Sequence, residues 1–132
     1  MRILLTFALA LSIPAFSQDD KVARGKYLVD EVARCGDCHT PKLLDGSFVK
    51  SATLRGTQLN FAAAVPIAGW RSTTPDITPK GALWPRWGED GISKFLQTGK
   101  GPRGSKAGPP MPAYNLRPED ADAIVAYLKT LQ

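Results

Sequence analysis

The five-residue segment Cys35-Gly36-Asp37-Cys38-His39 constrains this chain more than any other feature of its sequence. The two thiols lie three positions apart, so each can add to one vinyl group of the same porphyrin ring. The histidine that follows the second thiol can then offer a ring nitrogen to the iron. The pattern C-x-x-C-H is typical of covalent c-type haem attachment. The sequence holds 2 cysteines and 1 histidine in all, so no second arrangement of these residue types exists.

Three other roles for these residues stay open at this stage. Cys35 and Cys38 could form a disulfide bond, with His39 on the surface. A redox-active dithiol would need a strand–helix–strand pattern around the pair, whereas here a helical pattern precedes it and a loop rich in proline and glycine follows. A structural zinc site usually needs four protein ligands, and these residues supply three. The context favours haem, because the chain also has an export signal, a preceding helix, a distant methionine and a closing C-terminal helix.

Residues 1–17 have the pattern of a secretory signal peptide. Arg2 provides the positive start, residues 3–13 an apolar stretch, and Ala15-Phe16-Ser17 a small-x-small cleavage site. The apolar stretch is too short to span a bilayer as a helix, although a retained anchor is the alternative. We therefore expect export, cleavage after Ser17, and a single domain over residues 18–132 that does not span the membrane.

The charge pattern argues against nucleic-acid binding. The chain has 17 Lys+Arg against 12 Asp+Glu, a formal net charge of +5, but its cations are scattered singly along the sequence. It has neither a run of like charge nor a basic stripe interleaved with aromatic residues. A mildly basic face could steer the protein toward an acidic redox partner, while an ordinary solvated surface explains any single lysine equally well.

The first predicted helix covers residues 20–33, with Asp19 or Asp20 as its cap. Gly25 lies inside this helix, where glycine costs roughly 1 kcal/mol relative to alanine. Such a cost suggests a packing reason, namely a second helix that crosses at close range. A tolerated surface glycine is the equal alternative.

Two further helices are predicted over residues 89–98 and 118–131. Gly99 can end the first of them in the left-handed conformation. The second has apolar residues at three–four spacing, and Arg117 before it is a poor cap. Residues 41–85 show no helical or strand periodicity. A loop of this length needs an organising group, and a covalently held haem would serve.

Met111 is the candidate for the second axial ligand of the iron. It is the one methionine besides the initiator and lies in Gly108-Pro109-Pro110-Met111-Pro112. Prolines on both sides restrict the backbone and hold the thioether in place. A thioether opposite histidine suits haem iron and raises its reduction potential. Methionine often fills gaps in a core instead, but the position of Met111 between the haem motif and the closing helix favours ligation.

Together these features resemble the class I cytochromes c, over essentially the whole chain after the signal segment. The resemblance rests on the helix with Gly25, on Cys35 to His39, on Leu54-x-Gly56, on Met111-Pro112 and on the last helix. It implies an all-α cytochrome c fold of about three to four helices, with long ordered loops around one covalent haem c and helices that cross near Gly25. Cys35 and Cys38 would form the thioethers, His39 would be the proximal ligand and Met111 the distal ligand.

The resemblance also implies a function. The protein would be an electron carrier of the bacterial periplasm rather than an enzyme, able to serve as a subunit of an oxidoreductase complex. It would pass electrons between a dehydrogenase and a respiratory acceptor through transient docking with redox proteins. Residues 74–79 and Trp87 look like the cytochrome subunits of membrane-linked alcohol and sugar dehydrogenases. The alternative is a haem-based sensor or ligand-binding protein with an open or displaceable sixth site.

Two positions depart from the family pattern. Ala52 stands where many members have a proline whose carbonyl holds the ligand histidine. A backbone carbonyl needs no proline, so the bond to His39 can survive, and which carbonyl supplies it stays open. Asp76 stands where the dehydrogenase-type proteins usually have asparagine. Five further side chains are candidates for the surroundings of a haem. We expect Trp84 and Trp87 to pack in the core and leave the role of Trp70 open. We expect Arg55 and Arg71 to meet the haem propionates.

Overall fold

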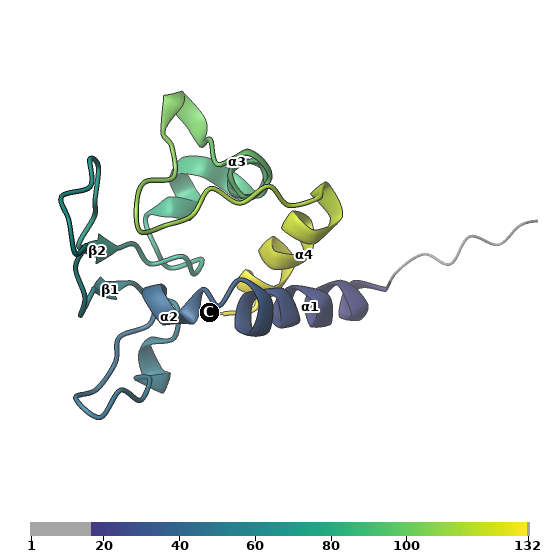
Figure 1. The fold of residues 1–132 in the computed structure, drawn as a ribbon. Helices are drawn as coiled ribbons and strands as arrows, with labels where there is room; N and C mark the ends of the chain where they lie inside the picture. The colour runs from purple at the N-terminus through teal and green to yellow at the C-terminus, as the bar shows by residue number, and fades with distance from the viewer. Residues whose placement is uncertain (1–16, 132) are drawn as a thin grey trace, which may run out of the picture.

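The computed structural model of the protein describes residues 17–131 (Figure 1). Residues 1–16, which make up nearly all of the predicted signal segment, lie outside the described part of the chain. Cleavage and export therefore stay predictions. Among the helices of residues 17–131, none combines the length and the apolar character that a membrane crossing requires.

Helices dominate the described chain, and a small two-stranded sheet joins them. The elements are α1 (Gln18–Tyr27), the π-helical turn η1 (Leu28–Val32), α2 (Gly36–His39), the 3-10 turn η2 (Lys50–Ala52), β1 (Thr57–Gln58), β2 (Thr73–Thr74), α3 (Leu83–Thr98), the 3-10 turn η3 (Pro102–Gly104) and α4 (Pro118–Leu128). The two strands pair antiparallel. The predicted helical class is thus confirmed, with the sheet as an addition.

The first helix differs from its prediction at both ends. It begins at Gln18, because Ser17 rather than Asp19 or Asp20 is the cap: the Asp20 N–H donates to Ser17 Oγ at 3.2 Å. The Asp20 carboxylate accepts from the Ser17 N–H in return, which completes a capping box. At the other end α1 gives way to the wider η1, and the regular helix does not reach the predicted end at residue 33.

Two other helix ends also need correction. The third helix begins at Leu83 instead of residue 89, since a first turn precedes Gly88, whose φ of 66° and ψ of 175° break the helical run. The last helix ends at Leu128, short of the predicted residue 131. Gly99 ends α3 in the left-handed conformation as predicted, with φ 66°. Arg117 gives α4 no side-chain cap, which agrees with its poor capping chemistry.

One apolar core joins η1, α3 and α4 with the loop residue Leu54. Trp84 and Trp87 pack against it, and the Trp84 indole N–H donates to the Ile77 carbonyl at 2.9 Å, so their predicted packing roles are confirmed. The fully packed members are Leu28, Val29, Leu54, Ile92, Leu96, Ala121, Ala123, Ile124, Val125 and Leu128.

Gly25 lies where α1 and α4 cross, which confirms the close approach predicted for it. A Cβ atom at this position would stand 1.9 Å from the Ala123 carbonyl oxygen and 2.8 Å from Tyr127 Cβ. The Arg24–Asp120 ion pair, at 2.9 Å, joins the same two helices. Since the nearest atom is backbone, no side-chain rotation can relieve the contact.

We predict that Gly25→Ala lowers the free energy of unfolding by about 3 kcal/mol or more, because overpacking against backbone forces the helices apart. On an unpacked helix the same change would stabilise by about 1 kcal/mol. Urea unfolding of the purified protein followed by circular dichroism measures this. Ala23→Gly, at an exposed position of α1, is the control and should cost only about 1 kcal/mol. Stabilisation by Gly25→Ala would contradict the crossing.

Candidate functional site

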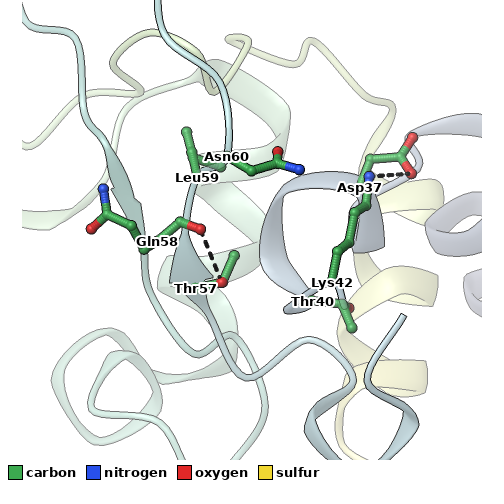
Figure 2. A pocket seen from close by; sticks show the side chains of 7 residues that line it. All are labelled: Asp37, Thr40, Lys42, Thr57, Gln58, Leu59 and Asn60. Atoms are coloured by element: carbon green, nitrogen blue, oxygen red, sulfur yellow. Dashed lines mark hydrogen bonds and ion pairs between the residues drawn. The ribbon is translucent and has the colours of Figure 1, made fainter. Parts of the chain in front are cut away.

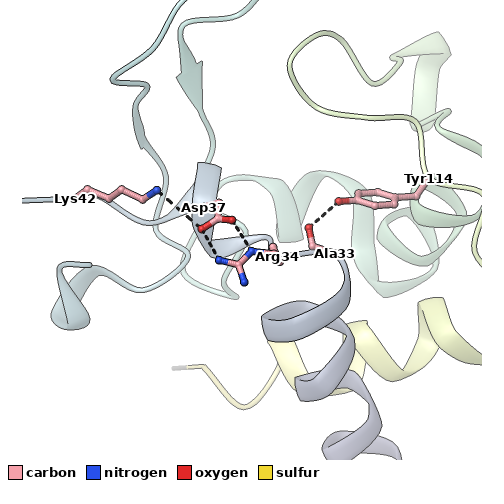
Figure 3. A network of polar contacts seen from close by, with 5 residues as sticks. All are labelled: Ala33, Arg34, Asp37, Lys42 and Tyr114. Carbon is pink, nitrogen blue, oxygen red and sulfur yellow. Dashed lines mark hydrogen bonds and ion pairs between the residues drawn. The ribbon is translucent and has the colours of Figure 1, made fainter. Parts of the chain in front are cut away.

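The Cys-x-x-Cys-His segment forms the short helix α2, which begins after a sharp change of chain direction. Arg34 adopts the left-handed conformation with φ 49° and separates η1 from α2. The His39 N–H then donates to the Cys35 carbonyl at 2.9 Å, which places the first cysteine and the histidine one turn apart. Asp37, between the cysteines, pairs with Arg34 at 2.7 Å and with Lys42 at 3.9 Å (Figure 3). These contacts hold its pKa below the usual value, with the Arg34 hydrogen bond as the main cause.

The two cysteines are free, and the first of them lacks the lowered pKa of a reactive thiol. Each is half-buried, and the structure forms no disulfide between them. Burial raises the pKa of the Cys35 thiol to about 11, whereas reactive cysteines have lowered values. Within residues 17–131 no three His, Cys, Asp or Glu side chains gather in a way that could hold a metal ion among them. The dithiol and zinc alternatives therefore lack support in the geometry.

His39 is held in one orientation by a main-chain carbonyl. Its ring is 6% exposed, and Nδ1 lies 2.9 Å from the Pro75 carbonyl oxygen. Because a carbonyl can only accept, Nδ1 carries the proton and Nε2 keeps its lone pair. Burial lowers the pKa of His39, with the Pro75 bond opposing in part, so the neutral ring is favoured.

The second ring nitrogen of His39 is available to bind something. Nε2 makes no hydrogen bond to the described residues. Every fully buried side-chain nitrogen or oxygen atom among residues 17–131 has a hydrogen-bond partner, so Nε2 is not fully buried. Nε2 therefore opens onto accessible space instead of being sealed in the core. A neutral imidazole with its other nitrogen bonded to a carbonyl is the usual arrangement of a metal-binding histidine.

The carbonyl that orients His39 lies in an unexpected place. The sequence left the source of this carbonyl open. The Ala52 carbonyl is not that source, because it accepts from the Arg55 N–H at 3.1 Å in a turn. The carbonyl that bonds to the His39 ring belongs to Pro75, the residue directly after β2. Pro75 lies in the family-like stretch 74–79, but nothing in the sequence singles out its carbonyl as the partner of His39.

Further polar contacts fasten α2 to the middle of the chain. The Thr74 hydroxyl donates to the Cys38 carbonyl at 2.8 Å and accepts from the Thr57 N–H at 3.0 Å. The Gly56 N–H donates to the His39 carbonyl at 2.7 Å. The Leu54 N–H donates to the Thr40 hydroxyl at 2.9 Å. The small sheet and the Leu54 turn thus hold the histidine segment from one side.

Met111 lies in a loop that is tied down on both of its sides. We call residues 108–112 the Met111 loop. The Met111 N–H donates to the Gly108 carbonyl at 3.0 Å, and the Arg71 N–H donates to the Pro109 carbonyl at 2.8 Å. On the C-terminal side, the Tyr114 hydroxyl donates to the Ala33 carbonyl at 3.0 Å (Figure 3). Met111 itself is half-buried.

Sequence reasoning did not single out Tyr114. Burial, and then the neighbouring Cys35 and Cys38, raise the pKa of its hydroxyl, so it stays a hydrogen-bond donor at neutral pH. A lone tyrosine directly after a proline-rich loop was the available signal, but nothing in the sequence names its carbonyl partner.

The remaining candidates stay predictions. Trp70 is half-buried and packs edge-on against Phe61, with ring centroids 6.0 Å apart. Arg55 and Arg71 are exposed and take part in none of the ion pairs formed within residues 17–131. Their side chains are thus free to meet an anionic group.

A small cavity beside α2 is not a cofactor site. Its volume is about 50 Å³, enough for one or two waters. It is lined by Asp37, Thr40, Lys42, Thr57, Gln58, Leu59 and Asn60 (Figure 2). The donors of chemical interest lie in the segment next to this cavity: the thiols of Cys35 and Cys38 and the free imidazole nitrogen of His39, which match the attachment chemistry of a c-type haem.

Comparison with known proteins identifies the family of this chain. The sequence model of the family described as Cytochrome c matches residues 22–132. The chain is similar to the fructose dehydrogenase cytochrome subunit of Gluconobacter japonicus, with 32% identity over 120 residues, 87% of this chain and 23% of that protein. It is also similar to a diheme cytochrome c-type protein of Cereibacter sphaeroides, with 36% identity over 111 residues, 80% of this chain and 34% of that one.

A third relative is the gluconate 2-dehydrogenase cytochrome c subunit of Pantoea cypripedii, 29% identical over 123 residues, 89% of this chain and 28% of that protein. The chain thus spans between 23% and 34% of the length of these three relatives.

We predict that Thr74→Val lowers the free energy of unfolding by about 1–3 kcal/mol, because it leaves the Cys38 carbonyl and the Thr57 N–H without their shared partner. Urea unfolding of the purified protein measures the change. Thr73→Val is the matched control, since Thr73 is the exposed neighbour in the same strand. Equal effects of the two substitutions would contradict the bridging role of Thr74.

Proposed function

We propose that this chain, which belongs to the cytochrome c family, carries one covalent haem c and works as a one-electron carrier in the bacterial periplasm. The observation that carries the proposal is the His39 ring, buried directly after Cys38, with Nδ1 bonded to the Pro75 carbonyl and Nε2 left free. The single Cys-x-x-Cys-His segment of the sequence supports one haem. The export pattern of residues 1–17 supports the location.

Four residues would hold the haem. Cys35 and Cys38 would form the two thioethers to the porphyrin, and His39 Nε2 would bind the iron as the proximal ligand. Met111 would supply its thioether sulfur as the distal ligand. When bound, a haem iron supplies a one-electron couple between its ferrous and ferric states.

The residues of this chain contribute three things to that couple. The Pro75 carbonyl keeps His39 in a single tautomer, so that Nε2 needs no proton loss before it binds metal. Arg71 and Tyr114 hold the Met111 loop from two sides. With both axial positions filled by the protein, no open site is left for a substrate, which is why we propose a carrier instead of a catalyst.

A basic hairpin beside the Met111 loop supports docking of an acidic redox partner. The Ala107 N–H donates to the Gly99 carbonyl at 2.9 Å, and the hairpin between them carries the exposed cations Lys100, Arg103 and Lys106. None of these three joins an ion pair within residues 17–131. Lys100 and Lys106 even face each other across the hairpin, although like charges in this position destabilise it.

The hairpin itself carries charge of one sign. Residues 91–118 contain no aspartate or glutamate, so nothing nearby in the sequence neutralises the three cations. Figure 1 shows the hairpin, which follows α3, projecting away from α1. An acidic surface on a dehydrogenase or oxidase would complement this charge and speed encounter at low salt.

The first test is the absorption spectrum of the purified exported protein, ferric and then reduced, with haem staining on a denaturing gel. We expect covalent haem, sharp low-spin bands, and the weak far-red band of methionine-ligated ferric haem. A high-spin spectrum would move the function to ligand binding or sensing. A colourless protein would refute the proposal and return attention to the two thiols.

We predict that Met111→Ala keeps the covalent haem, lowers the reduction potential and lets the reduced protein bind carbon monoxide, because the thioether no longer fills the sixth position. Redox titration and carbon monoxide difference spectra measure these changes. Asn115→Ala, an exposed residue just beyond the same loop, is the control and should behave as the unmodified protein. An unchanged potential in Met111→Ala would rule out Met111 as the ligand.

We predict that the double variant Lys100→Glu/Lys106→Glu slows oxidation of the reduced protein by hexacyanoferrate(III) about tenfold at low ionic strength, because the trianion loses local attraction. Stopped-flow absorbance at several salt concentrations measures the rate. Lys21→Glu/Lys50→Glu changes the net charge equally at distant positions and should slow the reaction less. Equal slowing by both double variants would show that net charge alone controls the rate, and would contradict docking at the hairpin.

A further inference from the structure

We propose that Tyr114 is a positioning residue that sets how readily Met111 leaves the iron. Its hydrogen bond to the Ala33 carbonyl would keep the Met111 loop closed over the haem-attachment segment. This inference rests on the proposed His39/Met111 ligation, and it assigns to Tyr114 control over access to the sixth coordination site.

The Ala33 carbonyl is free to accept because of the local backbone. Just after Ala33, the left-handed Arg34 interrupts the helical hydrogen-bond pattern. The N–H groups four and five residues later bond to other carbonyls. The Asp37 N–H donates to the Arg34 carbonyl, and the Cys38 N–H donates to the Cys35 carbonyl. The Tyr114 hydroxyl, at 3.0 Å, therefore satisfies a helix-end carbonyl that the main chain leaves open.

The position of this bond allows it to restrict the movement of Met111. Ala33 lies two residues before Cys35, the first proposed point of haem attachment, and Tyr114 lies three residues after Met111. The bond therefore links the segment that carries the distal ligand to the segment that carries the haem (Figure 3).

The other attachments of the loop do not provide this link. The Pro109 carbonyl bonds to the Arg71 N–H, and the Leu116 N–H donates to the Leu96 carbonyl at 3.2 Å. Both tie the loop to parts of the chain outside the attachment segment. Without the Tyr114 hydroxyl, the loop keeps these two attachments and the chain still folds, but Met111 can move off more often.

Tyr114→Phe tests the inference, since it removes the hydroxyl and keeps the ring that packs beside the core. We expect the ferric variant to bind added imidazole about five- to tenfold more tightly than the unmodified protein, because opening no longer breaks a hydrogen bond. The far-red methionine band should weaken in parallel. Amide hydrogen exchange at Met111 should speed up, which reports loop opening independently of the iron. Tyr27→Phe is the control, because the Tyr27 ring is 53% exposed on α1.

The results separate a failure of the Tyr114 role from a failure of the proposed Met111 ligation. Tighter imidazole binding and faster exchange in Tyr114→Phe alone would support the positioning role. A lower unfolding midpoint with unchanged imidazole affinity would overturn it and leave Tyr114 a purely structural residue. If the unmodified ferric protein lacks the methionine band, the proposed ligation fails, and this inference fails with it. If that band is present and Tyr114→Phe changes neither it nor imidazole binding, the inference alone fails.

Discussion

The hydrogen bond from His39 Nδ1 to the Pro75 carbonyl is the contact on which the rest of the site depends. It joins residues 36 positions apart and fixes both the tautomer and the orientation of the one histidine. The neighbouring bonds of Thr74 and Gly56 to α2 carbonyls act in the same region. A segment without regular periodicity thus becomes ordered because its main chain and hydroxyls satisfy the polar groups of α2, the proposed haem-attachment helix.

The helices and the loops divide the structural work. The helices supply most of the apolar core, and the close approach of α4 to Gly25, which leaves no room for a Cβ atom, fixes how α1 and α4 cross. The residues proposed to bind the iron depend instead on single main-chain carbonyls: those of Pro75 and Pro109 in loops and that of Ala33 at the end of η1. Core substitutions should therefore act mainly on stability, and loop substitutions on the iron environment.

Much of this structure could be predicted from the sequence wherever a backbone conformation or a close helix approach requires one particular residue type. Gly25 marked the helix crossing because a buried glycine in a helix is otherwise costly, and Gly99 marked a helix end because it tolerates positive φ. Contacts to main-chain carbonyls could not be predicted, since every residue has a carbonyl. For that reason Pro75 and the Tyr114–Ala33 bond appeared only in the structure. The early start of α3 was missed because Gly88 breaks the helix after its first turn.

The two sides of the proposed iron site differ in how they are secured, and this difference has a chemical consequence. His39 is buried and bound through its own ring, so it has one orientation and no easy alternative. The Met111 side chain has no N–H or O–H group with which to be held, and its position depends on Pro109, two residues before it, and Tyr114, three residues after it. A thioether is also the weaker ligand of the two. Loss of a ligand would therefore occur on the methionine side, and the neighbours of Met111, more than Met111 itself, would decide how often it happens.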